Sequence, residues 1–166
     1  NDNQNVTLSA GVFVSKPSFP IGRGAEIAGD CLEKAKEVIL KGKTEGKNQI
    51  HIFGRTIKWE DFPFLLEEAK KLAVMVEKEE IPHAFIYRLL EYEASFQSYY
   101  RDGLVEGLKY IPLLIYDITR NFAPKTKEAF TWLEELKDIN KKKTIYLRFI
   151  LEYVINQTRR GLNGEL

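Results

Sequence analysis

The hydrophobic and polar positions in the first third of the chain follow the pattern of a β-α-β unit. Residues 6–14 form a β-branched and apolar run with small residues at its centre, which predicts a strand. The prolines within residues 16–20 predict a loop, and apolar positions then follow helical spacing over residues 23–40. Residues 49–53 alternate as a second strand. If the two strands are parallel, their connection is a right-handed crossover.

After Gly54 the apolar positions change to the spacing of amphipathic helices, and we expect no further strand. About five helices with short connections are predicted, which makes a bundle. In the first of them, Glu68 and Lys71 belong to the polar face. Pro112 should kink or interrupt the third helix, which otherwise covers residues 104–118. The residues expected at or just before the starts of the other helices are Asp61, Pro82, Pro124 and residues 141–143.

This change of pattern predicts an α+β protein in two parts. A β-α-β unit occupies residues 1–56, a helical bundle residues 57–160, and a flexible tail residues 161–166. Two strands are too few for an independent sheet, and the run 6–14 is apolar on both sides of its pleat. We therefore expect the first part to pair with further chain: an upstream half of the same domain, a second copy, or a neighbouring subunit.

Composition then narrows the class of protein. Of the 166 residues, 44% are apolar and 30% are charged, as in soluble globular proteins. The net charge of +1 gives no global basic field, so any nucleic-acid contact would be a local patch. No apolar run is long enough to span a bilayer and no signal peptide is present, so we expect a cytoplasmic protein without membrane contact. Cys31, the only cysteine, excludes an intrachain disulfide and a multi-cysteine zinc site.

Short motifs in the first part occur in a recognisable order. Ser9 and Gly11 lie in the first strand, Ala35 and Lys36 are late in the predicted helix, and residues 46–48 read Gly-Lys-Asn before the second strand. This order resembles the end of palm domains of the GGDEF type. The residues within these motifs are more similar to those of the large subunit of type III-A CRISPR effector complexes, in which a C-terminal helical domain follows the palm. The resemblance covers the whole chain, most strongly its first third.

The resemblance implies a fold and an activity. The fold would be the last β-α-β of a ferredoxin-like palm domain followed by an all-α helical bundle. The activity would be polymerisation of ATP, with Mg²⁺, into cyclic oligoadenylates when the complex binds target RNA. The Gly-Gly-Asp-Asp hairpin that holds the metal ions in this family is not in the sequence, and neither is the His-Asp nuclease motif. Because the chain also begins without Met, we interpret it as a segment of a longer protein that is inactive alone.

The family's partners and binding residues are implied in the same way. The partners would be the other subunits of the complex, including the small helical subunit, and the upstream half of the palm. Guide RNA and target RNA would be contacted only indirectly. The nucleotide-binding residues implied are Ser9, Gly11, Arg23, Lys36 and Lys47; no catalytic residue and no metal ligand is expected in this segment.

Each of these residues also has an ordinary structural explanation. Lys36 matches a phosphate-contacting lysine of the family, yet it also fits a solvated helix face. Lys47 replaces the arginine of a Gly-Arg-Asn segment and so gives up bidentate phosphate recognition. Ser9 and Gly11 would let a nucleotide approach the strand, and tight packing of strand on helix explains them equally well. Arg23, near the helix start, is the weakest match.

Two other functions remain open for the whole chain. One is a non-catalytic scaffold with a degenerate palm, and the other is a diguanylate-cyclase-like domain fused to an unrelated bundle. The metal-binding hairpin expected upstream would distinguish these functions, because its residues differ from one class to the next. The densest basic group would either contact a nucleic-acid backbone or keep the surface soluble. Its members are residues 141–143, Arg148, Arg159 and Arg160.

Overall fold

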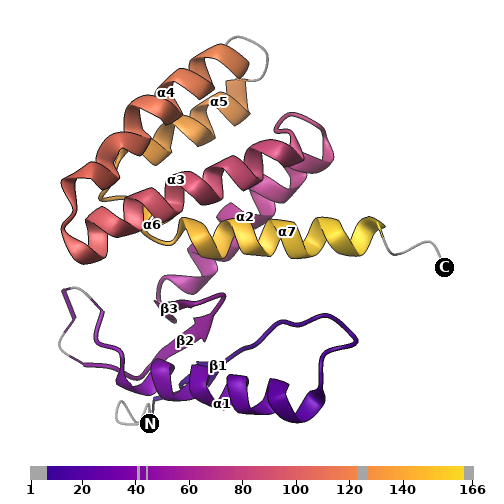
Figure 1. The fold of residues 1–166 in the computed structure, drawn as a ribbon, viewed down its shortest axis with the longest axis vertical. Coiled ribbons are helices and arrows are strands. Elements are labelled where there is room, and N and C mark those ends of the chain that lie inside the picture. The colour runs from indigo at the N-terminus through magenta and orange to yellow at the C-terminus, as the bar shows by residue number, and fades with distance from the viewer. Residues whose placement is uncertain (1–6, 41, 44, 123–126, 163–166) are drawn as a thin grey trace, which may run out of the picture. The chain divides into compact units, whose positions relative to one another are not determined.

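The computed structural model describes residues 7–40, 42–43, 45–122 and 127–162, with side chains up to residue 158 (Figure 1). The chain divides into two compact units, Asn1–Phe64 and Leu65–Leu166. The first contains a small mixed sheet with one helix, and the second is helical. The predicted α+β class is therefore confirmed.

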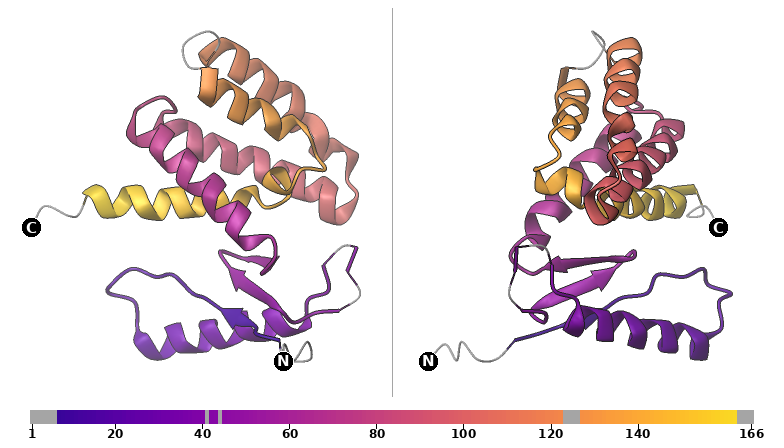
Figure 2. Two further views of the ribbon diagram at one scale, coloured as in Figure 1. Left: turned by 180° about the vertical axis from the view of Figure 1, so that it is seen from behind. Right: turned by 60° about the vertical axis from the view of Figure 1, so that its left-hand side comes forward.

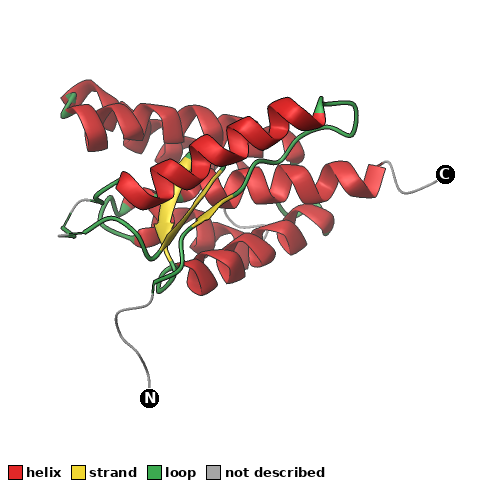
Figure 3. Cartoon of the chain, turned by 90° about the horizontal axis from the view of Figure 1, so that it is seen from below, coloured by secondary structure: helices red, strands yellow, loops and turns green. Residues whose placement is uncertain are grey.

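The two predicted strands of the first unit form a parallel pair. Strand β1 (Ala10–Gly11) leads through a loop to helix α1 (Ile21–Glu37), and strand β2 (Gln49–Ile52) follows. Ala10 pairs with Ile50 in parallel register. Figure 3 shows the strands side by side. Helix α1 ends at Glu37 rather than near residue 40, because Val38 is extended (φ −66°, ψ 119°).

A third strand contradicts the expectation that strands end before Gly54. Strand β3 (Arg55–Lys58) pairs antiparallel with β2, and the expected domain boundary after residue 56 falls inside it. Phe53 and Gly54 form the two-residue turn, with φ values of 51° and 71°. Positive φ at both positions is the type I′ geometry that matches the twist of a hairpin. The hairpin was not predicted because phenylalanine occupies a turn position where asparagine or aspartate is usual.

Strand β1 is much shorter than the predicted run and lies at the edge of the sheet, whose order is β1-β2-β3. Leu8 is 69% exposed and Val14 is 40% exposed. Val6 lies outside the described residues. An exposed apolar edge is what unpaired palm strands would leave, so pairing with further chain stays a prediction for this unit.

The second unit is a set of packed helices without a strand in its described part. Helix α3 packs against α4 and α7, and α4 packs against α5 (Figure 2). Phe96, Leu133 and Phe149 are almost fully buried in the core. None of the helices in the described ranges has both the length and the apolar character needed to cross a membrane. The helices are α2 (Phe62–Glu77), α3 (His83–Asp102), η1 (Val105–Lys109), α4 (Tyr110–Asn121), α5 (Lys127–Glu134), η2 (Glu135–Lys137), α6 (Lys142–Ile145) and α7 (Leu147–Leu162).

Several helix boundaries differ from the prediction. The helix predicted over residues 104–118 is divided into η1 and α4. Pro112 lies in the first turn of α4, where backbone N–H groups have no intrahelical partner. The predicted last helix is broken at Tyr146 into α6 and α7. Helix α7 continues through Leu162, so the tail expected from residue 161 starts inside a helix. Pro124 and residues 163–166 lie outside the described part of the chain.

Candidate functional site

Helix α1 lies directly against the backbone of β1 at Gly11. A Cβ atom at this position would lie 2.2 Å from the backbone N of Leu32 and 2.6 Å from the carbonyl O of Ala28. No side chain fits within such distances. Close packing of the helix on the strand therefore accounts for Gly11, and on that side the space is filled by α1.

The two predicted phosphate-binding lysines have their backbones in contact at the end of α1. The backbone N–H of Lys47 donates a hydrogen bond to the carbonyl O of Lys36 (3.1 Å). A Cβ atom on Gly46 would lie 2.4 Å from the same oxygen, so a glycine is needed there. Both lysine side chains are exposed. The backbone of Lys47 therefore lies against the end of α1.

The other two candidates lie differently. The Gln49 side chain, at the start of β2, donates to the carbonyl O of Val38 (2.7 Å), so the end of α1 lies at the amino ends of the strands. Ser9 directly precedes β1, so it lies at the same amino ends, because β1 and β2 are parallel. Arg23 lies in the first turn of α1, about 20 Å along the helix from Lys36. The structure therefore separates Arg23 from the other candidates.

The end of α1 is not a natural phosphate site by itself. A helix C-terminus carries partial negative charge and attracts cations, and Lys34 and Lys36 stand in this last turn. Lys36 is paired with Glu33 (2.9 Å). The positive charge that a phosphate needs would therefore have to come from lysine side chains. Within the described ranges, no group of three His, Cys, Asp or Glu residues is arranged to hold a metal ion.

The sequence did not identify Lys58, the residue that holds the loop before β2 (residues 45–48). The ammonium of Lys58, on β3, donates to the carbonyl oxygens of Glu45 (3.1 Å), Gly46 (3.3 Å) and Lys47 (2.7 Å). Lys58 is only 9% exposed. In the sequence it is one more lysine in a chain that has 25 Lys and Arg, and nothing in its spacing distinguishes it.

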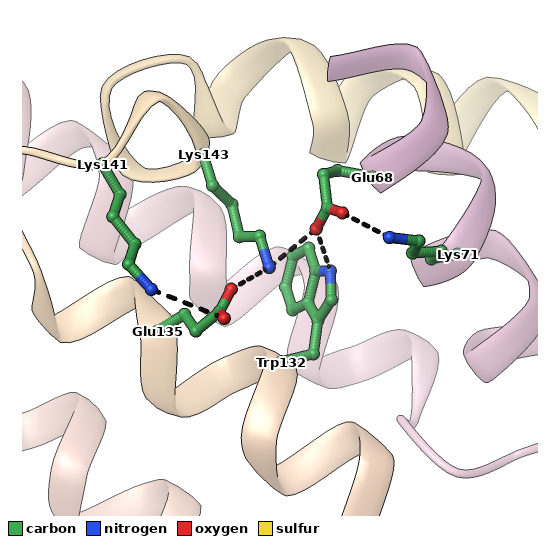
Figure 4. A network of polar contacts seen from close by, with 6 residues as sticks. All are labelled: Glu68, Lys71, Trp132, Glu135, Lys141 and Lys143. Atoms are coloured by element: carbon green, nitrogen blue, oxygen red, sulfur yellow. Dashed lines mark hydrogen bonds and ion pairs between the residues drawn. The ribbon is translucent and has the colours of Figure 1, made fainter. Parts of the chain in front are cut away.

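A second polar feature lies in the helical unit, and we call it the Glu68 cluster (Figure 4). Glu68 accepts hydrogen bonds from Trp132 Nε1 (2.9 Å) and Lys71 (2.8 Å), and it pairs with Lys143 (2.7 Å). Lys143 also pairs with Glu135 (2.5 Å) and lies 4.5 Å from the centre of the Trp132 ring. The cluster borders a surface pocket of about 490 Å³. Its members are Glu68, Lys71, Trp132, Glu135, Lys141 and Lys143.

This cluster changes the picture of two predicted surfaces. The side chains of Glu68 and Lys143 are only 6% and 5% exposed, so Glu68 is not on a solvated helix face. Lys143, the most buried of the described members of the basic group near residue 141, is held by two carboxylates. Lys141 also pairs with Glu135 (3.4 Å), and Arg148 pairs with Glu152 (2.8 Å). Lys141, Lys143 and Arg148 therefore form ion pairs within the protein; the side chains of Arg159 and Arg160 lie outside the described part.

The cluster should make the helical unit sensitive to acid. Burial acts to raise the pKa of Glu68, but hydrogen bonds from Lys143 and Lys71 outweigh it and hold the pKa below its ordinary 4.5. A hydrogen bond from Lys143 likewise lowers the pKa of Glu135. A carboxyl with a lower pKa in the folded state stabilises the fold above its unfolded pKa. That contribution should be present above about pH 4.5 and be lost as the pH falls through the folded-state pKa.

Urea unfolding followed at Trp132 between pH 7 and pH 3 measures this effect. The urea midpoint of the helical unit should fall as the pH is lowered below 4.5, and less steeply in a Glu68→Gln variant. Equal slopes in the two proteins would show that Glu68 contributes nothing to the acid sensitivity.

No family model matches this chain, and neither the curated proteins nor the solved structures include a significant match. What the chain does must therefore be inferred from its own residues and their geometry.

Proposed function

We propose that this chain is the C-terminal portion of the large subunit of a type III CRISPR effector complex. Its first unit would help to bind ATP for the synthesis of cyclic oligoadenylates. Its helical unit would contact the other subunits, including the small helical subunit. The observation that supports this most directly is the hydrogen bond between Lys47 N–H and Lys36 O. This bond brings the Ala35-Lys36 motif and the Gly-Lys-Asn motif of the family resemblance together at the amino ends of the strands.

The chemistry of this end of the sheet suits a polyphosphate. Lys36 and Lys47 carry exposed ammonium groups from two adjacent segments, and Ser9 lies at the same end with a hydroxyl that can donate to phosphate. Mg²⁺ would neutralise charge on the reacting phosphates when bound. Its carboxylate ligands would come from the hairpin that precedes this segment in the family. The residues described here would bind and orient phosphate, while Glu33 competes for Lys36 in the absence of nucleotide.

A non-catalytic scaffold is the second candidate. Two observations favour it: α1 fills the space beside Gly11, and Lys36 already has a carboxylate partner in Glu33. The coding sequence immediately upstream tests both proposals. A Gly-Gly-Asp-Asp hairpin would support ATP use, whereas a hairpin without its carboxylates would support the scaffold.

Replacing Lys36 by alanine should weaken ATP use by the complete protein in its complex. A charge-assisted hydrogen bond contributes about 1.5–3 kcal/mol. Because Lys36 is 43% exposed, the effect should lie at the low end, roughly a tenfold increase in KM for ATP. The measurement is conversion of labelled ATP into cyclic oligoadenylates in the presence of target RNA.

Lys34→Ala is the matched control for this prediction. Lys34 is also exposed and in the last turn of α1, but two residues away on a helix it points to a different side. It should leave KM unchanged. Equal product formation by wild type and a well-folded Lys36→Ala variant would return Lys36 to an ordinary solvated lysine.

A further inference from the structure

Residues 45–48, which we call the Gly46 loop, are held from two opposite sides. On one side, three successive carbonyl oxygens converge on the ammonium of Lys58 at 2.7–3.3 Å. On the other side, the N–H of Lys47 donates to the carbonyl of Lys36. The peptide that joins Gly46 to Lys47 takes part in both contacts, since its C=O points to Lys58 and its N–H to α1. A planar trans peptide directs these two groups in opposite directions, so both contacts fix the same plane.

The loop also has a backbone that needs such support. Lys47 and Asn48 have φ values of 58° and 49°, in the left-handed region that non-glycine residues seldom occupy. Strained backbone of this kind persists only where its surroundings determine it. Lys58 provides those surroundings, because it is 9% exposed and its ammonium has three protein acceptors.

We propose that Lys58 is a positioning residue for phosphate binding. Its ammonium holds the Gly46 loop so that the backbone of Lys47 lies against the end of α1 at Lys36. It also adds positive charge next to the negative end of α1, where phosphate would otherwise be repelled. The proposal rests on the proposed function, since it assigns the loop to the polyphosphate of the nucleotide.

Two measurements on the 166-residue chain separate the positioning role from the ligand. The first is amide hydrogen exchange at Lys47. In Lys58→Met, the three carbonyls lose their donor, and exchange at Lys47 should accelerate at least tenfold because the loop opens locally. In Lys58→Arg, which keeps a charged donor, the acceleration should be smaller. Lys34→Met, an exposed lysine on α1, should leave the exchange rate at Lys47 unchanged.

The second measurement is a titration with inorganic triphosphate, followed by the amide NMR signals of Lys36 and Lys47. Lys58→Met should weaken binding about fivefold, although Lys58 itself does not contact the ligand. If Lys58→Met fails to fold, Gly46→Ala perturbs the same loop from the α1 side, where the new Cβ would meet the carbonyl of Lys36. It should give the same acceleration and the same loss of binding.

The outcomes are distinguishable. Unchanged exchange at Lys47 in folded Lys58→Met would overturn the positioning role whatever the titration shows. Faster exchange with unaltered triphosphate binding, or no binding by wild type, would keep Lys58 as the residue that orders the loop and overturn the phosphate assignment. Faster exchange together with weaker binding supports the proposal.

Discussion

Replacing Lys143 by methionine should destabilise the helical unit by about 3 kcal/mol. Removing one partner of a buried ion pair leaves the other charge without compensation, which typically costs about 3–5 kcal/mol. Here Glu68 is 6% exposed and would lose its closest cation, at 2.7 Å. Lys71 and the Trp132 indole would remain bound to Glu68 and keep the loss near the low end of that range.

The chain itself offers a probe for this measurement. It has two tryptophans, and Trp132 is the one in the helical unit. Its indole N–H signal, which reports the bond to Glu68, can be followed through a urea titration separately from that of Trp59. The expected result is a lower urea midpoint for Trp132 with little change for Trp59.

Two further variants test the cause. Glu68→Gln combined with Lys143→Met removes the uncompensated charge and keeps an acceptor for the Trp132 indole, so it should recover about 1 kcal/mol. Lys137→Met breaks an exposed ion pair with Glu134 and should change the free energy of unfolding by less than about 0.5 kcal/mol. A loss in Lys137→Met equal to that in Lys143→Met would show that burial is not the reason.

Replacing Gly11 by alanine should destabilise the first unit by about 3 kcal/mol or more. Overpacking typically costs about 1–3 kcal/mol, and more when the obstacle cannot move. The added Cβ would meet backbone atoms of α1, including N of Leu32 at 2.2 Å, so no side-chain rotation relieves the contact. The helix must move away from β1 or the strand must leave the sheet.

Gly29→Ala is the matched control, since it makes the same substitution in the same unit. Apart from its chain neighbours and the adjacent backbone of its own helix, no atom lies within 4 Å of a Cβ at Gly29, which is inside α1. It should raise stability by about 0.5–1 kcal/mol, because alanine loses less conformational entropy in a helix. Urea unfolding followed at Trp59, which donates to the carbonyl of Leu8 in the same unit, measures both variants. A Gly11→Ala protein as stable as wild type would contradict the close approach of α1 to β1.

The sequence predicted those elements in which the hydrophobic spacing and the residues at the element ends indicate the same secondary structure. Helical spacing located α2 and α3, and Pro82 preceded α3 as expected. Alternation located β2, whereas the parallel pairing of β1 with β2, which the sequence left as a condition, comes from the structure. The order of the motifs also identified Lys36 and Lys47 as candidate residues, but the sequence did not predict the contact between their backbones. The predicted features depend on residues within a few turns of one another, where the sequence carries the signal directly.

Other features were decided only by residues distant in sequence. β3 was missed because its turn lacks the usual residues, yet pairing with β2 stabilises it. Nothing in the spacing of Lys58 distinguished it from other lysines, and Glu68 was assigned to a polar face because periodicity places polar residues there. Their burial depends on the carbonyls of the Gly46 loop in one case, and on Trp132 and Lys143 in the other. A charged side chain is stable in the interior only when partners meet it there, and tertiary structure alone determines which partners those are.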